Sequence, residues 1–220
     1  MTATDVAGET LSLLPERAIY WPRTKTLIVA DLHWGKEETF RAGGVPIPLG
    51  PVHADLRRLD RIIEETSAER LLILGDLWHA RAGMTLSLIG DLEQWRATHA
   101  SLAIELIRGN HDRRAGPLPN ALHLTVREEP AIEAPFVFQH FPVPSVAGYV
   151  LAGHVHPAVV LRGPGKQKIR LPCFWFGREV GLLPAFGGFT GAAEIIPANG
   201  DRVFVATDTE VIEVSACRKL

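Results

Sequence analysis

The sequence predicts an α/β fold, and three observations support this. Short apolar runs alternate with segments of helical spacing in the first half of the chain, which is the pattern of βαβ units. From about Val159 onward, the chain consists of short strand-like pieces separated by turns. The 220 residues, with a net charge of −2 and 46% hydrophobic residues, suit one globular domain with a sizeable core.

Five apolar runs are expected to be buried strands, because each is too short for a helix. They are Leu27–Ala30, Leu71–Leu74, Leu102–Ile107, Phe136–Phe138 and Tyr149–Ala152. Helices are expected at Asp55–Glu65 and Leu86–His99, where apolar residues recur at helical spacing on one face. The order strand, helix, strand, helix, strand indicates strands joined by right-handed crossovers.

The second half is expected to be rich in strands. The candidates are Val159–Leu161, Gln167–Leu171, Phe174–Phe176, Val203–Thr207 and Glu210–Val214. No linker divides the chain, so residues 1–220 are expected to form a single domain. The first ten residues are polar and small, and they are expected to be a flexible terminus.

Composition excludes several classes of protein. No apolar run reaches the roughly 18 residues of a membrane span, and we expect no secretory leader. The only two cysteines, Cys173 and Cys217, exclude a cysteine-based metal site and are weak evidence for a disulfide. We therefore expect a cytoplasmic protein that does not contact a membrane.

Residues of types that commonly bind metals follow each of the five apolar runs that we expect to be buried strands between Leu27 and Ala152. In chain order they are Asp31 and His33, then Asp76, then Asn110, then His140, then His154 and His156. Ligands in open α/β sheets gather at the carboxyl ends of the strands, so these side chains are expected to meet in one crevice.

The mixture of ligand types indicates the kind of metal. Carboxylate and amide oxygens combined with imidazoles suit Mn²⁺, Fe or Zn²⁺ and argue against a Ca²⁺ cage. Seven ligands are too many for one ion with an open position and suit two ions that share a carboxylate. One histidine after a strand is more often structural, but five such clusters at strand ends favour the metal interpretation.

The spacing of these residues adds geometric expectations. In Asp31-Leu32-His33 and in His154-Val155-His156, the polar residues are two positions apart. In an extended segment this places both on one side, with Leu32 turned toward the core. Glycines precede the ligands at positions 75, 109 and 153, where we expect a sharp turn or a close backbone approach.

The order of the motifs, between Leu27 and His156, resembles that of the calcineurin-like metallophosphoesterase superfamily. The motifs are Asp-x-His, Gly-Asp, Gly-Asn-His-Asp, a lone histidine and Gly-His-x-His. The resemblance implies a four-layer αββα sandwich, with two facing mixed β-sheets flanked by helices. It implies one metal held by Asp31, His33, Asp76 and His156, and a second held by Asp76, Asn110, His140 and His154, with Asp76 as the bridge.

Two departures from the superfamily pattern are visible. Gln139 precedes the lone histidine, His140, where many relatives have glycine. We also expect no additional cap domain, so short loops are expected to determine which substrate binds.

More narrowly, the chain resembles the bacterial ligase-associated DNA-damage-response endonucleases, the PdeM group. The stretches that carry this resemblance are residues 30–37, 41–48, 75–79, 171–176 and 183–191. This resemblance implies an association with a DNA ligase and a helicase.

Two divalent ions would act on a phosphoester through a metal-bridging hydroxide, so the nucleophile is not a side chain. His111 is expected to be the catalytic residue that handles the proton of the leaving oxygen, because its neighbour Asn110 is a ligand. Asp112 is expected to fix the tautomer of His111. The alternative role for His111 is to stabilise Asn110.

Several neighbouring residues are open to two interpretations. His79 either touches the substrate or the metal shell, or is an exposed loop histidine. Trp34 and Trp78 either stack a base or pack in the core. Lys36 and Arg41 either contact phosphate or are solvated.

Three functions remain open: a nuclease acting on DNA, a small-molecule or nucleotide phosphatase or phosphodiesterase with the same metal site, and a non-catalytic binding module. The complete ligand set argues against the module. The sequence pI of about 6.5, with no basic run longer than Arg57-Arg58 or Arg113-Arg114, indicates a modest or partner-assisted contact with DNA.

The oligomeric state is also open, because Phe174-Trp175-Phe176 and Phe186 suit either a dimer surface or the cover of a sheet.

Overall fold

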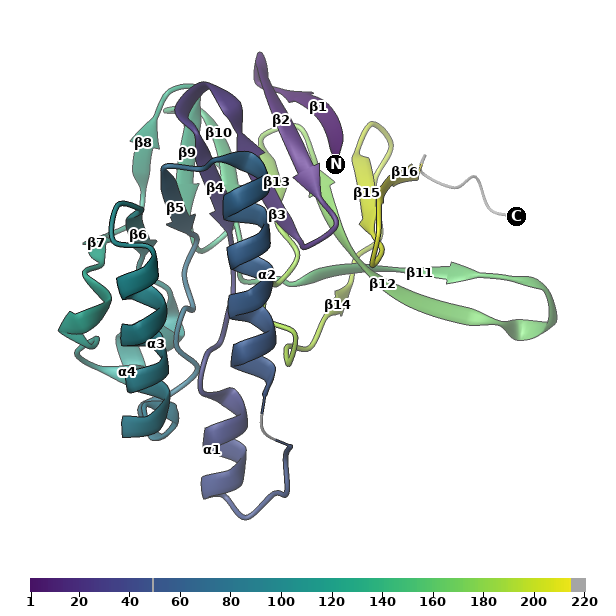
Figure 1. Ribbon diagram of the computed structural model, residues 1–220. Coiled ribbons are helices and arrows are strands. Elements are labelled where there is room, and N and C mark those ends of the chain that lie inside the picture. Colours follow the sequence, from purple (N-terminus) through teal and green to yellow (C-terminus); the bar gives the residue numbers. More distant parts are fainter. Residues whose placement is uncertain (49, 215–220) are drawn as a thin grey trace.

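The computed structural model describes residues 1–48 and 50–214, and it shows two β-sheets that face each other (Figure 1). Within these residues, the first sheet has seven strands in the order β1-β2-β3-β4-β5-β6-β7. Their bounds are Thr2–Val6, Glu9–Leu14, Ala18–Trp21, Thr26–Val29, Arg70–Ile73, Ala103–Ile107 and Thr125–Arg127. The first four strands are antiparallel neighbours, and β4 to β7 are parallel.

The second sheet has nine strands within the described residues. They are β8 Ala131–Glu133, β9 Phe136–Gln139, β10 Tyr149–Ala152, β11 Pro157–Arg162, β12 Lys168–Phe176, β13 Val180–Leu182, β14 Ala193–Glu194, β15 Arg202–Ala206 and β16 Val211–Val214. Strands β9, β10 and β13 are parallel neighbours, whereas β12 is antiparallel to β11, β13 and β15. Both sheets are therefore mixed, as expected.

The four α-helices of the described residues all lie between Lys36 and Ala115. They are α1 Lys36–Ala42, α2 Pro51–Thr66, α3 Leu86–Thr98 and α4 Asn110–Ala115, and short 3-10 turns occur at η1 Pro22–Thr24, η2 Arg81–Gly83, η3 Asn120–Leu122 and η4 Pro164–Lys166. Helices α2 and α3 connect the parallel strands, which confirms the βαβ units. Most strands of the second sheet follow each other through turns and loops, which need no crossover helix.

Two layers of apolar side chains hold the sandwich together. On one face of the first sheet, α2 buries Leu59 and Ile62 and α3 buries Leu92 and Trp95. The other face packs against the second sheet through a layer rich in aromatic rings, which includes Trp21, Phe136, Phe138, Phe174 and Phe204. The expected pair of facing sheets with flanking helices is thus confirmed, and Phe174 and Phe186 are buried rather than exposed.

The expectation that residues 1–10 form a flexible terminus is wrong. Strands β1 and β2 form an antiparallel hairpin, and Leu11 of β2 is fully buried. The hydroxyl of Thr2 donates a hydrogen bond to the carbonyl oxygen of Val211 in β16, at 2.7 Å. Polar residues were misleading here because alternate positions of an edge strand face solvent.

Two further expectations are refined. The segments 167–171 and 174–176, expected as separate strands, form the single strand β12. Cys173 is buried within it, and Cys217 lies outside the described residues. None of the helices in the described part of the chain is long and apolar enough to cross a membrane.

Candidate metal centre

The seven expected ligands lie just beyond the carboxyl ends of five strands. Strands β4, β5 and β6 of the first sheet lead to Asp31 and His33, to Asp76, and to Asn110. Strands β9 and β10 of the second sheet lead to His140 and to His154 and His156. The site is therefore built from both sheets at one edge of the sandwich, as the strand-end argument predicts.

One group of side chains consists of Asp31, His33 and His156, whose ligand atoms lie within 4.8 Å of one another. The Nε2 atoms of His33 and His156 are 3.4 Å apart, and Nε2 of His156 is 3.4 Å from Oδ1 of Asp31. This group is the first expected metal site without Asp76.

The second group consists of Asp76, His140 and His154, and Asn110 adjoins it. Nε2 of His140 is 3.4 Å from Oδ2 of Asp76, 3.0 Å from Oδ1 of Asn110 and 3.1 Å from Nδ1 of His154. Asp76 also approaches the first group, because its Oδ2 is 3.9 Å from Nε2 of His33. One carboxylate oxygen therefore stands between the two groups.

The backbone at five of the seven positions is left-handed. The φ angles are 55° at Asp31, 49° at His33, 50° at Asp76, 67° at His154 and 52° at His156. The assumption that Asp31-Leu32-His33 and His154-Val155-His156 are extended is therefore wrong, although Leu32 is buried as expected. Non-glycine residues adopt this conformation rarely, and such strain clusters at functional sites.

Close packing explains the glycines that precede the ligands. A Cβ atom on Gly109 would lie 2.3 Å from Oδ1 of Asp76, and one on Gly153 would lie 2.6 Å from Oδ2 of Asp31. Gly75, with φ of +82°, would place a Cβ 2.3 Å from Nδ1 of His140. The expected close approach is thus confirmed, and no side chain fits between these ligands and their neighbouring loops.

The donor set fits a pair of divalent ions. Oδ1 of Asp31 is buried and has no hydrogen-bond partner among the described residues, although it faces His156. A buried carboxylate oxygen without a partner carries a large desolvation cost, which a cation removes. Imidazole nitrogens and carboxylate oxygens at these separations are the ligands expected for Mn²⁺, Fe or Zn²⁺.

Burial and charge shift the pKa values of the clustered groups in opposite directions. Burial lowers the pKa of His33 to about 3, and Asp76 only partly opposes this. Burial alone would also lower the pKa of His140, but its hydrogen bond to Asp76 and the charge of that carboxylate raise it to about 9. Conversely, burial would raise the pKa of Asp76, and the contact with His140 holds it below its ordinary value. These opposite shifts in pKa arise from the same contact, in which the Asp76 carboxylate stabilises a proton on His140; a bound metal ion would take the place of that proton.

His111 lies beside the cluster at the start of α4. Its backbone N–H donates to Oδ1 of Asp76 at 2.8 Å, and its Nε2 is 4.0 Å from Oδ2 of the same residue. Its Nδ1 is 2.7 Å from the carbonyl oxygen of His79, so Nδ1 carries the hydrogen and donates it. This leaves Nε2 facing the cluster.

The prediction that Asp112 fixes the tautomer of His111 is wrong. The carboxylate of Asp112 is buried and accepts hydrogen bonds from the backbone N–H groups of Trp78 and Gly109, each at 3.0 Å. The carbonyl of His79 takes the role assigned to Asp112. Asp112 instead ties the loop after β5 to the start of α4, which places Asp76 against His111.

The residues left open by the sequence now have definite places. Trp34 and Trp78 are buried in the core, 3% and 0% exposed, so neither is available to stack a base. Arg41 pairs with Glu38 and donates to the carbonyl of Ile47, which braces the loop after α1.

His79 forms part of the site rather than an isolated loop residue. Its ring stacks on His111 with centroids 5.0 Å apart, and His33, His79 and His111 form a third group of closely spaced ligand atoms. Phe40, which is 39% exposed, lies parallel to His79 on its other side. Lys36 lies over the ring of Phe189, and Phe189 packs edge-on against Phe40. Phe40 could not be found from the sequence, because it lies outside every motif.

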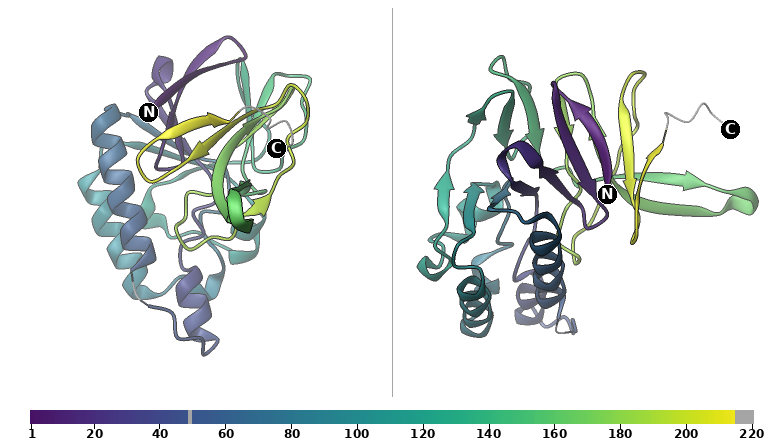
Figure 2. Two further views of the ribbon diagram at one scale, coloured as in Figure 1. Left: turned by 90° about the vertical axis from the view of Figure 1, so that its right-hand side faces the viewer. Right: turned by 45° about the horizontal axis from the view of Figure 1, so that its top comes forward.

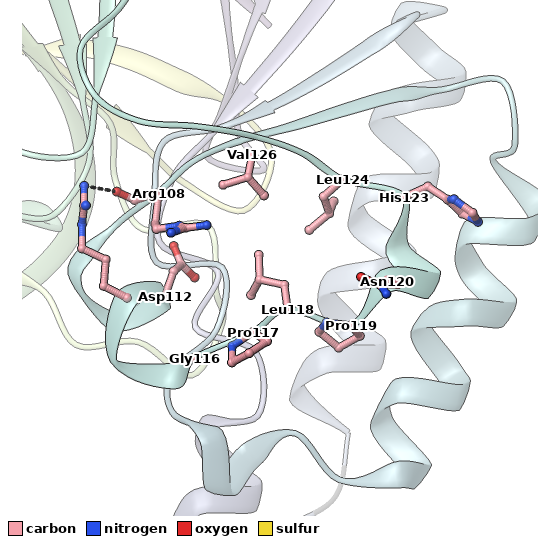
Figure 3. A pocket seen from close by; sticks show the side chains of 11 residues that line it. Arg108, Asp112, Gly116, Pro117, Leu118, Pro119, Asn120, His123, Leu124 and Val126 are labelled. Atoms are coloured by element: carbon pink, nitrogen blue, oxygen red, sulfur yellow. Dashed lines mark hydrogen bonds between the residues drawn. The ribbon is translucent and has the colours of Figure 1, made fainter.

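A pocket of about 550 Å³ lies next to this site, beside α4 (Figure 3). Leu118, Leu124 and Val126 face its interior, and Arg108 and Asp112 lie at one side. None of the seven expected ligands lines it. This pocket is therefore separate from the metal centre, although Asp112, which lines it, is the neighbour of His111 in the sequence.

Comparison with known proteins agrees with this geometry. The family model described as calcineurin-like phosphoesterase matches residues 24–163, which contain all seven expected ligands. The chain belongs to the calcineurin-like phosphoesterase family. It is accordingly a metal-dependent phosphoesterase, and the superfamily resemblance is confirmed.

Solved structures extend the comparison. The nuclease MPE of Pseudomonas putida is 45% identical, with a TM-score of 0.83, and the match covers 93% of this chain and 96% of that one. This similarity agrees with the narrower resemblance to the ligase-associated endonucleases. Yfce, a phosphoesterase from E. coli, is 14% identical with a TM-score of 0.43, over 87% of this chain and 99% of that one, and no argument rests on it. A search of curated proteins found no match.

Proposed function

We propose that this calcineurin-like phosphoesterase is a two-metal phosphodiesterase that cleaves DNA. The observation that carries the proposal is the place of Asp76, whose Oδ2 lies within 3.9 Å of His33 in one ligand group and 3.4 Å of His140 in the other. Asp31, His33, Asp76 and His156 would hold one ion, and Asp76, Asn110, His140 and His154 the other. Mn²⁺ is the proposed metal, with Fe or Zn²⁺ as alternatives.

When bound, two divalent ions supply an activated water and neutralise the charge that develops on the phosphate. The protein positions these ligands through the left-handed turns and the glycine contacts described above. Asp112 contributes as a positioning residue, because it holds the backbone at Trp78, two residues after Asp76, and at Gly109, just before Asn110.

His111 is the proposed general acid. Its Nδ1–H is held by the carbonyl of His79, and Nε2 faces the metal cluster, where it can hold the proton needed by the leaving oxygen. Protonation of the leaving group contributes about 10²–10⁴-fold to rate in general acid catalysis.

DNA is the proposed substrate because the similar protein from P. putida is a nuclease, which shares 45% of its residues with this chain. A role in DNA repair, in association with a DNA ligase and a helicase, is part of the proposal and rests on the resemblance. So are a cytoplasmic location and a single domain over residues 1–220.

The proposed function is tested by a comparison of substrates with Mn²⁺ present. Hydrolysis of bis-p-nitrophenyl phosphate, p-nitrophenyl phosphate, a panel of nucleotides, and single-stranded and duplex DNA is measured for the wild type and for His111→Ala. We expect DNA cleavage by the wild type, a loss of about 10²–10⁴-fold in the variant, and unchanged metal content. Turnover confined to monoesters or free nucleotides would instead identify a small-molecule phosphatase with the same metal site.

A further inference from the structure

We propose that the hairpin formed by β11 and β12 is an arm that binds the nucleic-acid backbone away from the cleaved bond. Figures 1 and 2 show this hairpin extending from the body of the molecule. Its outer part, residues 161–170, contains four basic residues and no acidic residue, in a chain with a net charge of −2. The proposal rests on the proposed action on DNA and adds the place where the strand is held.

Strand register gathers the positive charge on one face of the hairpin. Arg162 is directly opposite Lys168, and Arg170 is opposite Val160. Residues opposite each other share a face, and the face repeats every second residue, so Arg162, Lys168 and Arg170 lie together. All three are exposed. The opposite face carries Leu161 and Ile169.

These cations lack carboxylate partners. No acidic residue occurs in the sequence between Ala134 and Arg178. Among the ion pairs of the described residues, none involves Arg162, Lys168 or Arg170. Like charges directly opposite each other destabilise a hairpin, so this arrangement costs stability unless an anion lies across it. A phosphate backbone is the ligand whose charge and spacing suit such a row.

The hairpin is continuous with the metal centre. Strand β11 begins at Pro157, immediately after the proposed ligand His156. Its six residues reach about 20 Å at roughly 3.3 Å per residue, which corresponds to about six nucleotides at the rise of a duplex strand. The arm therefore contacts phosphates several nucleotides from the one at the metals.

This arrangement supplies a basic surface for DNA although the sequence contains no long basic run. No basic run occurs in this part of the sequence because the cations alternate with apolar residues and meet only through cross-strand pairing. Period-two alternation in residues 161–170, read together with the turn at Gly163-Pro164-Gly165, was the signal available in the sequence.

The test measures affinity for a fluorescein-labelled oligodeoxynucleotide, single-stranded and duplex, by fluorescence anisotropy with Mn²⁺ present, and every protein compared carries His111→Ala so that cleavage does not intervene. The variant combines Arg162→Gln, Lys168→Gln and Arg170→Gln. The matched control removes three exposed cations elsewhere, through Arg23→Gln, Lys25→Gln and Arg57→Gln. A second variant, Arg162→Lys with Arg170→Lys, keeps the charge.

We expect the triple hairpin variant to bind about tenfold or more weakly, and the slope of log affinity against log salt to fall in magnitude by about 2 for three lost single-strand phosphate contacts. The control and the charge-keeping variant should bind like the wild type. Thermal unfolding of each variant verifies that it is folded.

Three outcomes would overturn the proposal and are distinguishable. If the hairpin variant and the control lose DNA affinity equally, the loss comes from the change in net charge and not from the hairpin. Unchanged affinity in the hairpin variant, with wild-type DNA cleavage intact, removes the arm's role and leaves the proposed function standing. If light scattering then shows that Leu161→Ser with Ile169→Ser dissociates an oligomer, the hairpin is a self-association surface. If the wild-type protein hydrolyses bis-p-nitrophenyl phosphate but neither binds nor cleaves DNA, the proposed function itself is wrong.

Discussion

Asp76 is the side chain on which the proposed metal centre depends most, because its Oδ2 lies 3.9 Å from Nε2 of His33 in one ligand group and 3.4 Å from Nε2 of His140 in the other. Asp76→Ala should remove most of the bound metal and lower kcat/KM for bis-p-nitrophenyl phosphate by more than about 100-fold. That loss exceeds the 10–100-fold typical when a residue that only supports a ligand is removed. Metal content by mass spectrometry and steady-state kinetics measure both effects.

The matched control is Asp208→Ala, which removes an exposed carboxylate beyond β15. It should keep both metal and turnover. Full metal retention in Asp76→Ala would exclude the two-metal assignment.

Gly109 tests whether the close packing around the ligands matters. Gly109→Ala would place a Cβ 2.3 Å from Oδ1 of Asp76, so the carboxylate must shift and metal affinity should fall. The matched change Gly90→Ala, in an open position within α3, should leave metal binding unchanged and raise the free energy of unfolding by about 0.5–1 kcal/mol. Isothermal titration with Mn²⁺ and urea unfolding give the two quantities, and equal metal affinity in both variants contradicts the packing argument.

Much of this site could be predicted from the sequence, because each ligand sits in a short contiguous motif directly after a strand. The backbone conformation could not. Left-handed turns at Asp31 and His154 arise from the crowded meeting of loops, which no local pattern reveals. The partner of His111 was also missed, since it is a main-chain carbonyl, and every residue of the chain has one.

An ion-pair network that responds to acid joins β5, β6 and β7 of the first sheet to β8, at the edge of the second. Arg70 of β5 makes two hydrogen bonds to Glu133 of β8, at 2.8 and 2.7 Å, and Arg127 of β7 also pairs with Glu133. Burial would raise the pKa of Glu133, but the two arginines hold it below the ordinary 4.5. The network therefore ties the first sheet to the edge of the second while Glu133 is ionised.

A lowered pKa in the folded state means that the contribution of Glu133 is present above about pH 4.5 and is lost as the pH falls through the folded-state value. Glu133→Gln should thus be less stable than the wild type at pH 7, by about 1 kcal/mol for charged hydrogen bonds of a partly exposed carboxylate. The gap should shrink at pH 3. Urea unfolding at both pH values measures this difference in the free energy of unfolding. A difference that grows on acidification would contradict a lowered pKa for Glu133.

The strands and helices themselves were largely predictable, because α2 shows a clear apolar stripe, α3 buries Leu92 and Trp95 one turn apart, and the buried strands are mostly apolar. The basic arm was not found, because the alternation within residues 161–170 shows a row of charge only when the register of β11 against β12 is known. Pairing between strands is information that a single strand does not carry.

The amino-terminal hairpin connects distant parts of the molecule. Thr2 bonds to Val211 in β16, and a guanidinium nitrogen of Arg202 in β15 approaches the carbonyl of Asp5 at 3.4 Å. Deletion of residues 1–8 should therefore cost about 2 kcal/mol and lower Tm by about 4–8 °C, through lost ladder hydrogen bonds and apolar burial. Calorimetry of the truncated chain tests this, and an unchanged Tm would show that the segment is dispensable for stability.

The division of the proposed ligands between the sheets has a mechanical meaning. Asp31, His33, Asp76 and Asn110 belong to loops of the first sheet, and His140, His154 and His156 to loops of the second. Any ion held by members of both sets acts as a cross-link between the two halves of the sandwich, as a disulfide would. Removal of such an ion would weaken the contact between the two sheets at this edge. The shape of the crevice that receives the substrate would therefore depend on the same ions that take part in its cleavage.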